Sequence, residues 1–268
     1  MEDILEVPAP APDLALPYGP DPQQFGELRV PRGRGPHPVV IAIHGGFWRA
    51  EYGLGHLGHL CAALTSAGIA TWSLEYRRIG HQGGGFPGTL LDVARGADHV
   101  RRIARDHDLD LARAVAVGHS AGGHLALWLA GRGRLPRSHA LWCADPLALR
   151  GVVSLAGVSD LERAFDLGLG DGVVEALLGG TPAHFPARYA GASPRALLPT
   201  GVRTVLLHGA DDDTVPASMS ADFVDAARAA GDDSRLELLA GTGHFELIDP
   251  RAAQWAAVER SVRLALGS

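Results

Sequence analysis

A serine between two glycines is the strongest chemical signal in this sequence. Gly118-His119-Ser120-Ala121-Gly122 fits the pattern G-x-S-x-G, after a predicted strand and before a predicted helix. The glycines leave room for a tight turn that exposes the serine hydroxyl at a helix N-terminus, where the helix dipole favours developing negative charge. We therefore predict that Ser120 is a nucleophile; its alternative role is a helix N-cap without catalytic function.

A second glycine-rich segment, HGGFW at residues 44–48, follows an apolar strand. Backbone N–H groups in such a turn can stabilise the oxyanion of a tetrahedral intermediate. We predict that the amides of Gly46 and Phe47 form this oxyanion hole together with the amide of Ala121. Trp48 is a candidate residue of the substrate pocket, and core packing is its alternative role.

The base and the acid of a catalytic triad are expected after two later strands. His244 lies in the segment GTGHF and is predicted to act as general base. Three adjacent aspartates, at 211–213, compete for the acid that orients it. The spacing H-G-x-x-D-x-x-V-P, which begins at His208, selects Asp212.

Strands and helices alternate along the chain that carries these residues. Apolar runs rich in β-branched residues predict strands over residues 38–43, 69–75, 113–118, 150–156, 203–207 and 235–239. Apolar positions at helical spacing predict helices over residues 55–67, 89–106, 120–130, 217–230 and 250–266. This alternation predicts an α/β fold, a mainly parallel sheet with helices on both faces.

We expect a single domain over residues 26–268, preceded by a Pro/Ala-rich arm at residues 1–25. Six prolines exclude a regular helix from the arm. Mixed helix and turn signals over about 158–200 indicate a small cap-like insertion at the carboxyl edge of the sheet, over the active site. Asp160, at its start, is expected to cap a helix.

Composition excludes several classes of partner. The 268 residues carry a formal net charge of −6, which disfavours nucleic acid. The N-terminus lacks the features of a signal peptide, and no apolar run approaches the roughly 20 residues that span a bilayer, so we expect a cytoplasmic protein without a membrane partner. Two histidine pairs, His56 with His59 and His119 with His124, lack a third ligand, so no metal is expected. The sequence leaves the oligomeric state open.

Residues 37–250 resemble the α/β-hydrolase superfamily, in which serine, acid and histidine follow one another in this order. Residues His44 to Trp48 match the H-G-G-x-W element of arylformamidases (kynurenine formamidases), in which the second glycine and the next residue supply oxyanion amides. The H-G-x-x-D-x-x-V-P element is shared more widely, and the chain also resembles hormone-sensitive-lipase-like carboxylesterases. Phe47 departs from the lipase-type H-G-G-G.

The function expected from these motifs is a serine hydrolase of the carboxylesterase type. It would cleave small-molecule esters with small or aromatic groups through an acyl-enzyme, without a cofactor. An arylformamidase that hydrolyses N-formyl amides is the enzymatic alternative. A hydrolase-fold protein that binds a ligand without turnover is the alternative from another class.

Overall fold

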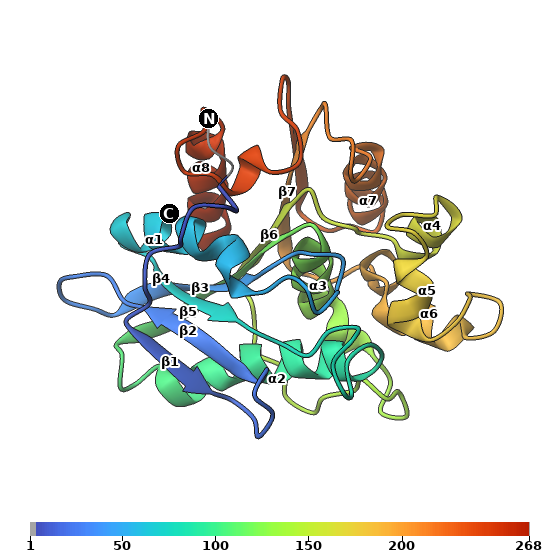
Figure 1. The fold of residues 1–268 in the computed structure, drawn as a ribbon, viewed down its shortest axis with the longest axis horizontal. Helices are drawn as coiled ribbons and strands as arrows, with labels where there is room; N and C mark the ends of the chain where they lie inside the picture. Colours follow the sequence, from blue (N-terminus) through green and yellow to red (C-terminus); the bar gives the residue numbers. More distant parts are fainter. Residues whose placement is uncertain (1–3, 268) are drawn as a thin grey trace.

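The computed structural model describes residues 4–267. Its centre is a sheet with the strand order β1-β2-β4-β3-β5-β6-β7-β8 (Figure 1). The pairs from β4 to β8 are parallel, whereas β2 is antiparallel to both β1 and β4. The strands are β1 Leu14–Pro17, β2 Phe25–Arg29, β3 His37–Ile43, β4 Ala70–Leu74, β5 Leu109–His119, β6 Gly151–Leu155, β7 Arg203–Gly209 and β8 Ser234–Leu239.

Helices cover both faces of the sheet, which confirms the predicted α/β architecture. Along β3, Val39 and Ile41 face the core beneath α2, α3 and α7, whereas Val40 and Ala42 face the core beneath α1 and α8. This alternation follows from the two-residue repeat of a strand. The helices are α1 Gly58–Ser66, α2 Gly88–Ile103, α3 Ala121–Gly131, α4 Leu161–Asp166, α5 Val173–Leu178, α6 Pro186–Ala192, α7 Ser218–Ala229 and α8 Trp255–Leu266.

Part of the segment expected as an arm at residues 1–25 belongs to the sheet. Residues 14–17 form β1, which pairs with β2 at the edge of the sheet. Prolines exclude a helix but not an edge strand, because one side of an edge strand needs no hydrogen-bond donors. Ahead of β1, the chain runs between α8 and α1 (Figure 1).

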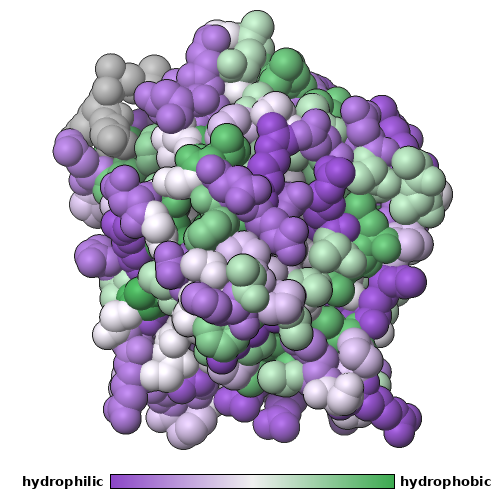
Figure 2. Space-filling model, turned by 90° about the vertical axis from the view of Figure 1, so that its right-hand side faces the viewer, coloured by the Kyte–Doolittle hydropathy of each residue, from purple (hydrophilic) through white to green (hydrophobic). Residues whose placement is uncertain are grey.

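The insertion expected at about 158–200 contains α4, α5 and α6. The carboxylate of Asp160 accepts hydrogen bonds from the amides of Glu162 and Arg163, which confirms that it caps α4. The insertion also contacts the loop after β3, because Arg49 donates a hydrogen bond to the carbonyl of Gly170 at 2.7 Å. Figure 2 shows the face of the molecule on this side, where hydrophobic patches alternate with hydrophilic side chains.

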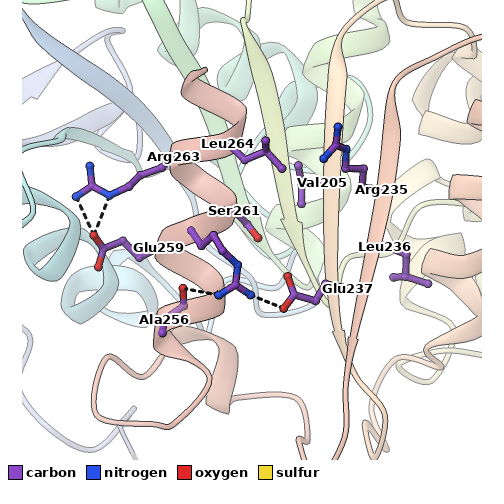
Figure 3. A pocket seen from close by; sticks show the side chains of 10 residues that line it. Val205, Arg235, Leu236, Glu237, Ala256, Glu259, Ser261, Arg263 and Leu264 are labelled. Carbon is purple, nitrogen blue, oxygen red and sulfur yellow. Dashed lines mark hydrogen bonds and ion pairs between the residues drawn. The ribbon is translucent and has the colours of Figure 1, made fainter. Parts of the chain in front are cut away.

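A wide groove lies between α8 and the strands β7 and β8, with a volume of about 740 Å³ (Figure 3). Ion pairs join side chains that line it: Arg260 on α8 contacts Glu237 on β8, and Arg263 contacts Glu259 within α8. None of the predicted catalytic residues lines it. Within residues 4–267, no helix has the length and apolar character needed to cross a membrane.

Candidate active site

Ser120 stands at the turn between β5 and α3. Its backbone has φ 55° and ψ −120°, a left-handed conformation that non-glycine residues rarely adopt. A Cβ on Gly118 would overlap the carbonyl of Gly122, and a Cβ on Gly122 would overlap the carbonyl of Ile43. Only glycine fits at both positions. The strained backbone at Ser120 therefore requires the two glycines of the G-x-S-x-G pattern. The serine side chain makes no capping hydrogen bond to α3 in the described part of the chain, unlike an N-cap.

The loop after β3 folds back through three consecutive residues with positive φ. The angles are 100° at Gly46, 51° at Phe47 and 54° at Trp48. Both Gly46 and Phe47 line a cavity together with Ser120. The backbone N–H groups of Gly46, Phe47 and Ala121 donate no hydrogen bond to another described residue. Free donors beside a serine hydroxyl can bind the oxygen of a substrate carbonyl.

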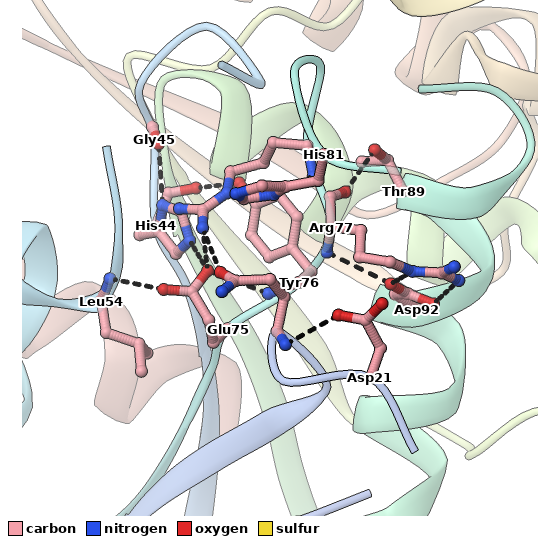
Figure 4. A network of polar contacts seen from close by, with 12 residues as sticks. Asp21, His44, Gly45, Leu54, Glu75, Tyr76, Arg77, His81, Thr89 and Asp92 are labelled. Atoms are coloured by element: carbon pink, nitrogen blue, oxygen red, sulfur yellow. Dashed lines mark hydrogen bonds and ion pairs between the residues drawn. The ribbon is translucent and has the colours of Figure 1, made fainter. Parts of the chain in front are cut away.

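A buried polar network fixes the residue at the start of this loop, His44 (Figure 4). The ring of His44 stacks on Tyr76 at 4.4 Å, and the Tyr76 hydroxyl donates to the carbonyl of His44 at 2.8 Å. The carboxylate of Glu75 lies 3.1 Å from His44 Nε2 and 3.0 Å from Arg78. Burial opposes ionisation of Glu75, but the hydrogen bond and charge of His44 and the charge of Arg78 lower its pKa. These contacts fix the backbone from which the oxyanion loop departs.

Asp212 and His244 meet at the carboxyl ends of β7 and β8. His244 Nδ1 lies 2.7 Å from Asp212 Oδ2, while Oδ1 accepts the amides of Thr214 and Val215 at 2.9 Å each. Burial acts to raise the pKa of Asp212, but hydrogen bonds from His208 and His244 lower it well below its usual value. An ionised Asp212 fixes the proton on Nδ1 and leaves Nε2 free to accept another.

Ser120 and His244 line the same cavity. No hydrogen bond joins their side chains in residues 4–267; catalytic hydrogen bonds often tighten only when substrate binds. Trp48 lies elsewhere: it is 1% exposed, and its indole N–H donates to His124 Nδ1 at 3.2 Å. The structure thus favours the packing alternative for Trp48 over a place in the substrate pocket.

Three further histidines surround the site, and the sequence motifs had not assigned them a role. His208 Nε2 lies 3.2 Å from the oxygen of Asp212 that contacts His244. His119 Nε2 donates to the carbonyl of His244 at 2.9 Å, and His119 Nδ1 lies 2.7 Å from His56 Nε2. Both His208 and His119 lie inside the motifs that contain Asp212 and Ser120, which is the only signal that could have marked them.

Burial keeps the pair formed by His56 and His119 uncharged. Desolvation, followed by the neighbouring imidazoles, lowers the pKa of His56 to about 3 and that of His119 well below its usual value. A neutral His119 that donates through Nε2 must accept through Nδ1, so His56 Nε2 carries the proton between them. No group of three or more metal-ligating side chains in residues 4–267 could hold a metal ion.

Known proteins with similar sequences include an esterase. The chain is 27% identical over 245 residues to a probable isoprenylcysteine alpha-carbonyl methylesterase from Oryza sativa subsp. japonica. The match covers 86% of this chain but only 57% of that protein.

Solved esterases have the same fold. A truncated carbohydrate esterase from gut microbiota has a TM-score of 0.80 at 18% identity, with 100% of this chain and 99% of that chain covered. Propionate-bound esterase 2 of Thermogutta terrifontis has a TM-score of 0.73 at 20% identity, with 94% and 91% covered. At these identities the likeness establishes the fold alone. The BD-FAE family model matches residues 28–226, most of the chain, and this protein therefore belongs to the BD-FAE family of esterase-like α/β-hydrolases.

Proposed function

We propose that this protein is a serine carboxylesterase acting on small-molecule esters with small or aromatic groups. The observation that carries the proposal is a single cavity lined by Ser120, His244, Gly46 and Phe47, with Asp212 bonded to the far side of the imidazole. Nucleophile, base, acid and oxyanion donors are the four parts that acyl transfer requires.

In the proposed reaction, Ser120 Oγ attacks the ester carbonyl carbon while His244 Nε2 takes the hydroxyl proton. The amides of Gly46, Phe47 and Ala121 bind the oxyanion, and Asp212 stabilises the imidazolium. The C–O bond to the alcohol then breaks, and His244 returns the proton to the departing oxygen. Water, activated by the same imidazole, releases the acid and restores the serine.

Formamide hydrolysis is the competing reaction, because residues 44–48 match the arylformamidase element. The curated relative is named a methylesterase, which supports an ester substrate for this chain. Comparing kcat/KM on p-nitrophenyl acetate with kcat/KM on N-formylkynurenine separates the two reactions.

The nucleophile is tested by a fluorophosphonate probe and by Ser120→Ala. We expect the probe to label the wild-type protein at Ser120, and the variant to fold normally but to retain less than about a thousandth of the wild-type kcat. Alanine is smaller than serine, so the turn at residues 118–122, which we call the elbow, can keep its shape. Activity should survive EDTA, because the proposed chemistry needs no metal ion. An unlabelled wild-type protein without turnover would instead identify a ligand-binding protein.

A further inference from the structure

The cavity above Ser120 is small and mostly apolar in its lining. Its volume is about 70 Å³. Pockets that bind drug-sized ligands have volumes of roughly 300–1,000 Å³, so this space suits only a small group. Its walls include Leu5, Tyr52 and Phe245 beside Ser120 and His244.

The N-terminal segment contributes one wall of this cavity. Leu5 belongs to the N-terminal segment and is 38% exposed, whereas the adjacent Ile4 is 6% exposed. Ile4 belongs to the core cluster beneath α8, together with Leu247 and Ile248. Ile4 and His244 also line a second groove, together with Asp211 and Asp213. The buried side chain of Ile4 therefore anchors the backbone that carries Leu5 beside the catalytic base.

Further contacts hold the segment downstream of Leu5. His59 Nε2 lies 3.1 Å from the carbonyl of Val7, and Arg29 donates to the carbonyl of Pro10 at 2.7 Å. Ala9 packs so closely on Gly58 that a Cβ there would overlap it. With Ile4 on one side and these contacts on the other, Leu5 is fixed from both directions.

We propose that Leu5 is a specificity-determining residue that limits the size of the ester bound at Ser120. The inference rests on the proposed function, because it assumes that Ser120 attacks the substrate. A short group fits the space between Leu5 and Ser120. A longer acyl or alcohol group has to displace the Leu5 side chain, or the segment that Ile4 anchors, and loses the free energy of those contacts. A change in cavity size by one methylene typically changes kcat/KM by about 10-fold or more.

The test is a size series measured on Leu5→Ala and Leu5→Trp. One series extends the acyl chain of p-nitrophenyl esters from acetate to octanoate; the other extends the alcohol of acetate esters from methyl to naphthyl. We expect Leu5→Ala to raise the ratio of kcat/KM for long over short substrates at least about 10-fold in one series, and Leu5→Trp to lower it. The series that responds identifies the substrate group that Leu5 faces.

Leu14→Ala is the matched control, because Leu14 is 41% exposed on β1 and does not line the cavity. It should leave both series unchanged. Size ratios that stay within about twofold of wild type in both Leu5 variants, well below the effect of one methylene, would overturn the inference. That failure differs from failure of the proposed function, which would appear as turnover in Ser120→Ala.

Discussion

Two imidazoles approach one carboxylate oxygen of Asp212. His244 lies 2.7 Å from Oδ2 and His208 lies 3.2 Å from it, while His208 Nε2 is also 2.9 Å from the carbonyl of Val215. The other nitrogen of His208 contacts the Ser220 hydroxyl on α7 at 2.7 Å. His208 thus connects Asp212 to α7 and favours the ionised form of its carboxylate. The ionised carboxylate can then orient His244.

The first prediction at this scale concerns the three adjacent aspartates. Asp212→Asn should lower kcat by about three to four orders of magnitude, because an amide no longer favours the required tautomer of His244. Asp211→Asn and Asp213→Asn should stay close to wild type, because both carboxylates are exposed to solvent. Steady-state kinetics on p-nitrophenyl acetate measures all three variants. A lower kcat in Asp211→Asn or Asp213→Asn than in Asp212→Asn would show that the catalytic acid is wrongly assigned.

Residue types and spacing were enough to propose the nucleophile, the base, the acid and the oxyanion amides, because each lies in a short motif at a strand end. They were not enough for contacts made across the chain. The bond from His119 to the carbonyl of His244 joins residues 125 positions apart. Leu5 and Phe245 also share a cavity that only the folded chain creates.

At the scale of elements, the turn between β5 and α3 leaves no room for additional side-chain atoms at its glycines. A Cβ at Gly123 would approach Gly157 and the Ser154 hydroxyl, so strand β6 and its following loop also press on the start of α3. The glycines of the elbow therefore have two roles: they allow the turn, and they let α3 pack closely against β6.

We predict that Gly122→Ala destabilises the protein by about 1–3 kcal/mol or more, because the new methyl group would overlap the carbonyl of Ile43. Gly55→Ala is its control, since no atom lies within 4 Å of a Cβ at that position. The control should change stability by less than about 0.5 kcal/mol. Urea unfolding measures both, and equal midpoints for the two variants would contradict this account of the elbow.

The parallel strands were predictable because continuous apolar runs mark strands buried on both faces. The antiparallel pair β1 and β2 was not predicted. Four residues of β1 follow a proline-rich stretch, and Gly26 interrupts the short β2, so neither shows a long apolar run. Gly26 is nevertheless required by the fold, because a Cβ there would overlap the ring of Trp72.

For the whole molecule, buried histidines couple folding to pH. Desolvation lowers the pKa of His56 to about 3, that of His124 to about 4, and that of His119 well below its usual value. In the unfolded chain each imidazole takes up a proton near pH 6.5. Between that pH and the lowered values, the unfolded state binds more protons than the folded state, so stability falls as the pH falls.

We therefore predict that the free energy of unfolding decreases between pH 7 and pH 5, with each of these histidines contributing about 1 kcal/mol per pH unit below 6.5. Urea unfolding at a series of pH values measures the slope. His124→Gln removes one titrating group while an amide can still accept from Trp48 and donate to the carbonyl of Ala192. The slope should become shallower in this variant, and an unchanged slope would contradict the assignment to His124.

The two ends of the described chain lie at opposite ends of the parallel strands: residues 4–5 near their carboxyl ends and Leu266 near their amino ends. Ile4 and Leu5 adjoin the cavity above Ser120, whereas Leu266 accepts a hydrogen bond from Arg150, just before β6 begins. A resin, surface or fusion partner joined after residue 268 would therefore leave the mouth of the cavity open to diffusing esters. The same attachment ahead of residue 4 would lie beside the cavity and next to Leu5, one of the side chains that line it. Immobilisation chemistry for this enzyme should accordingly use its carboxyl end.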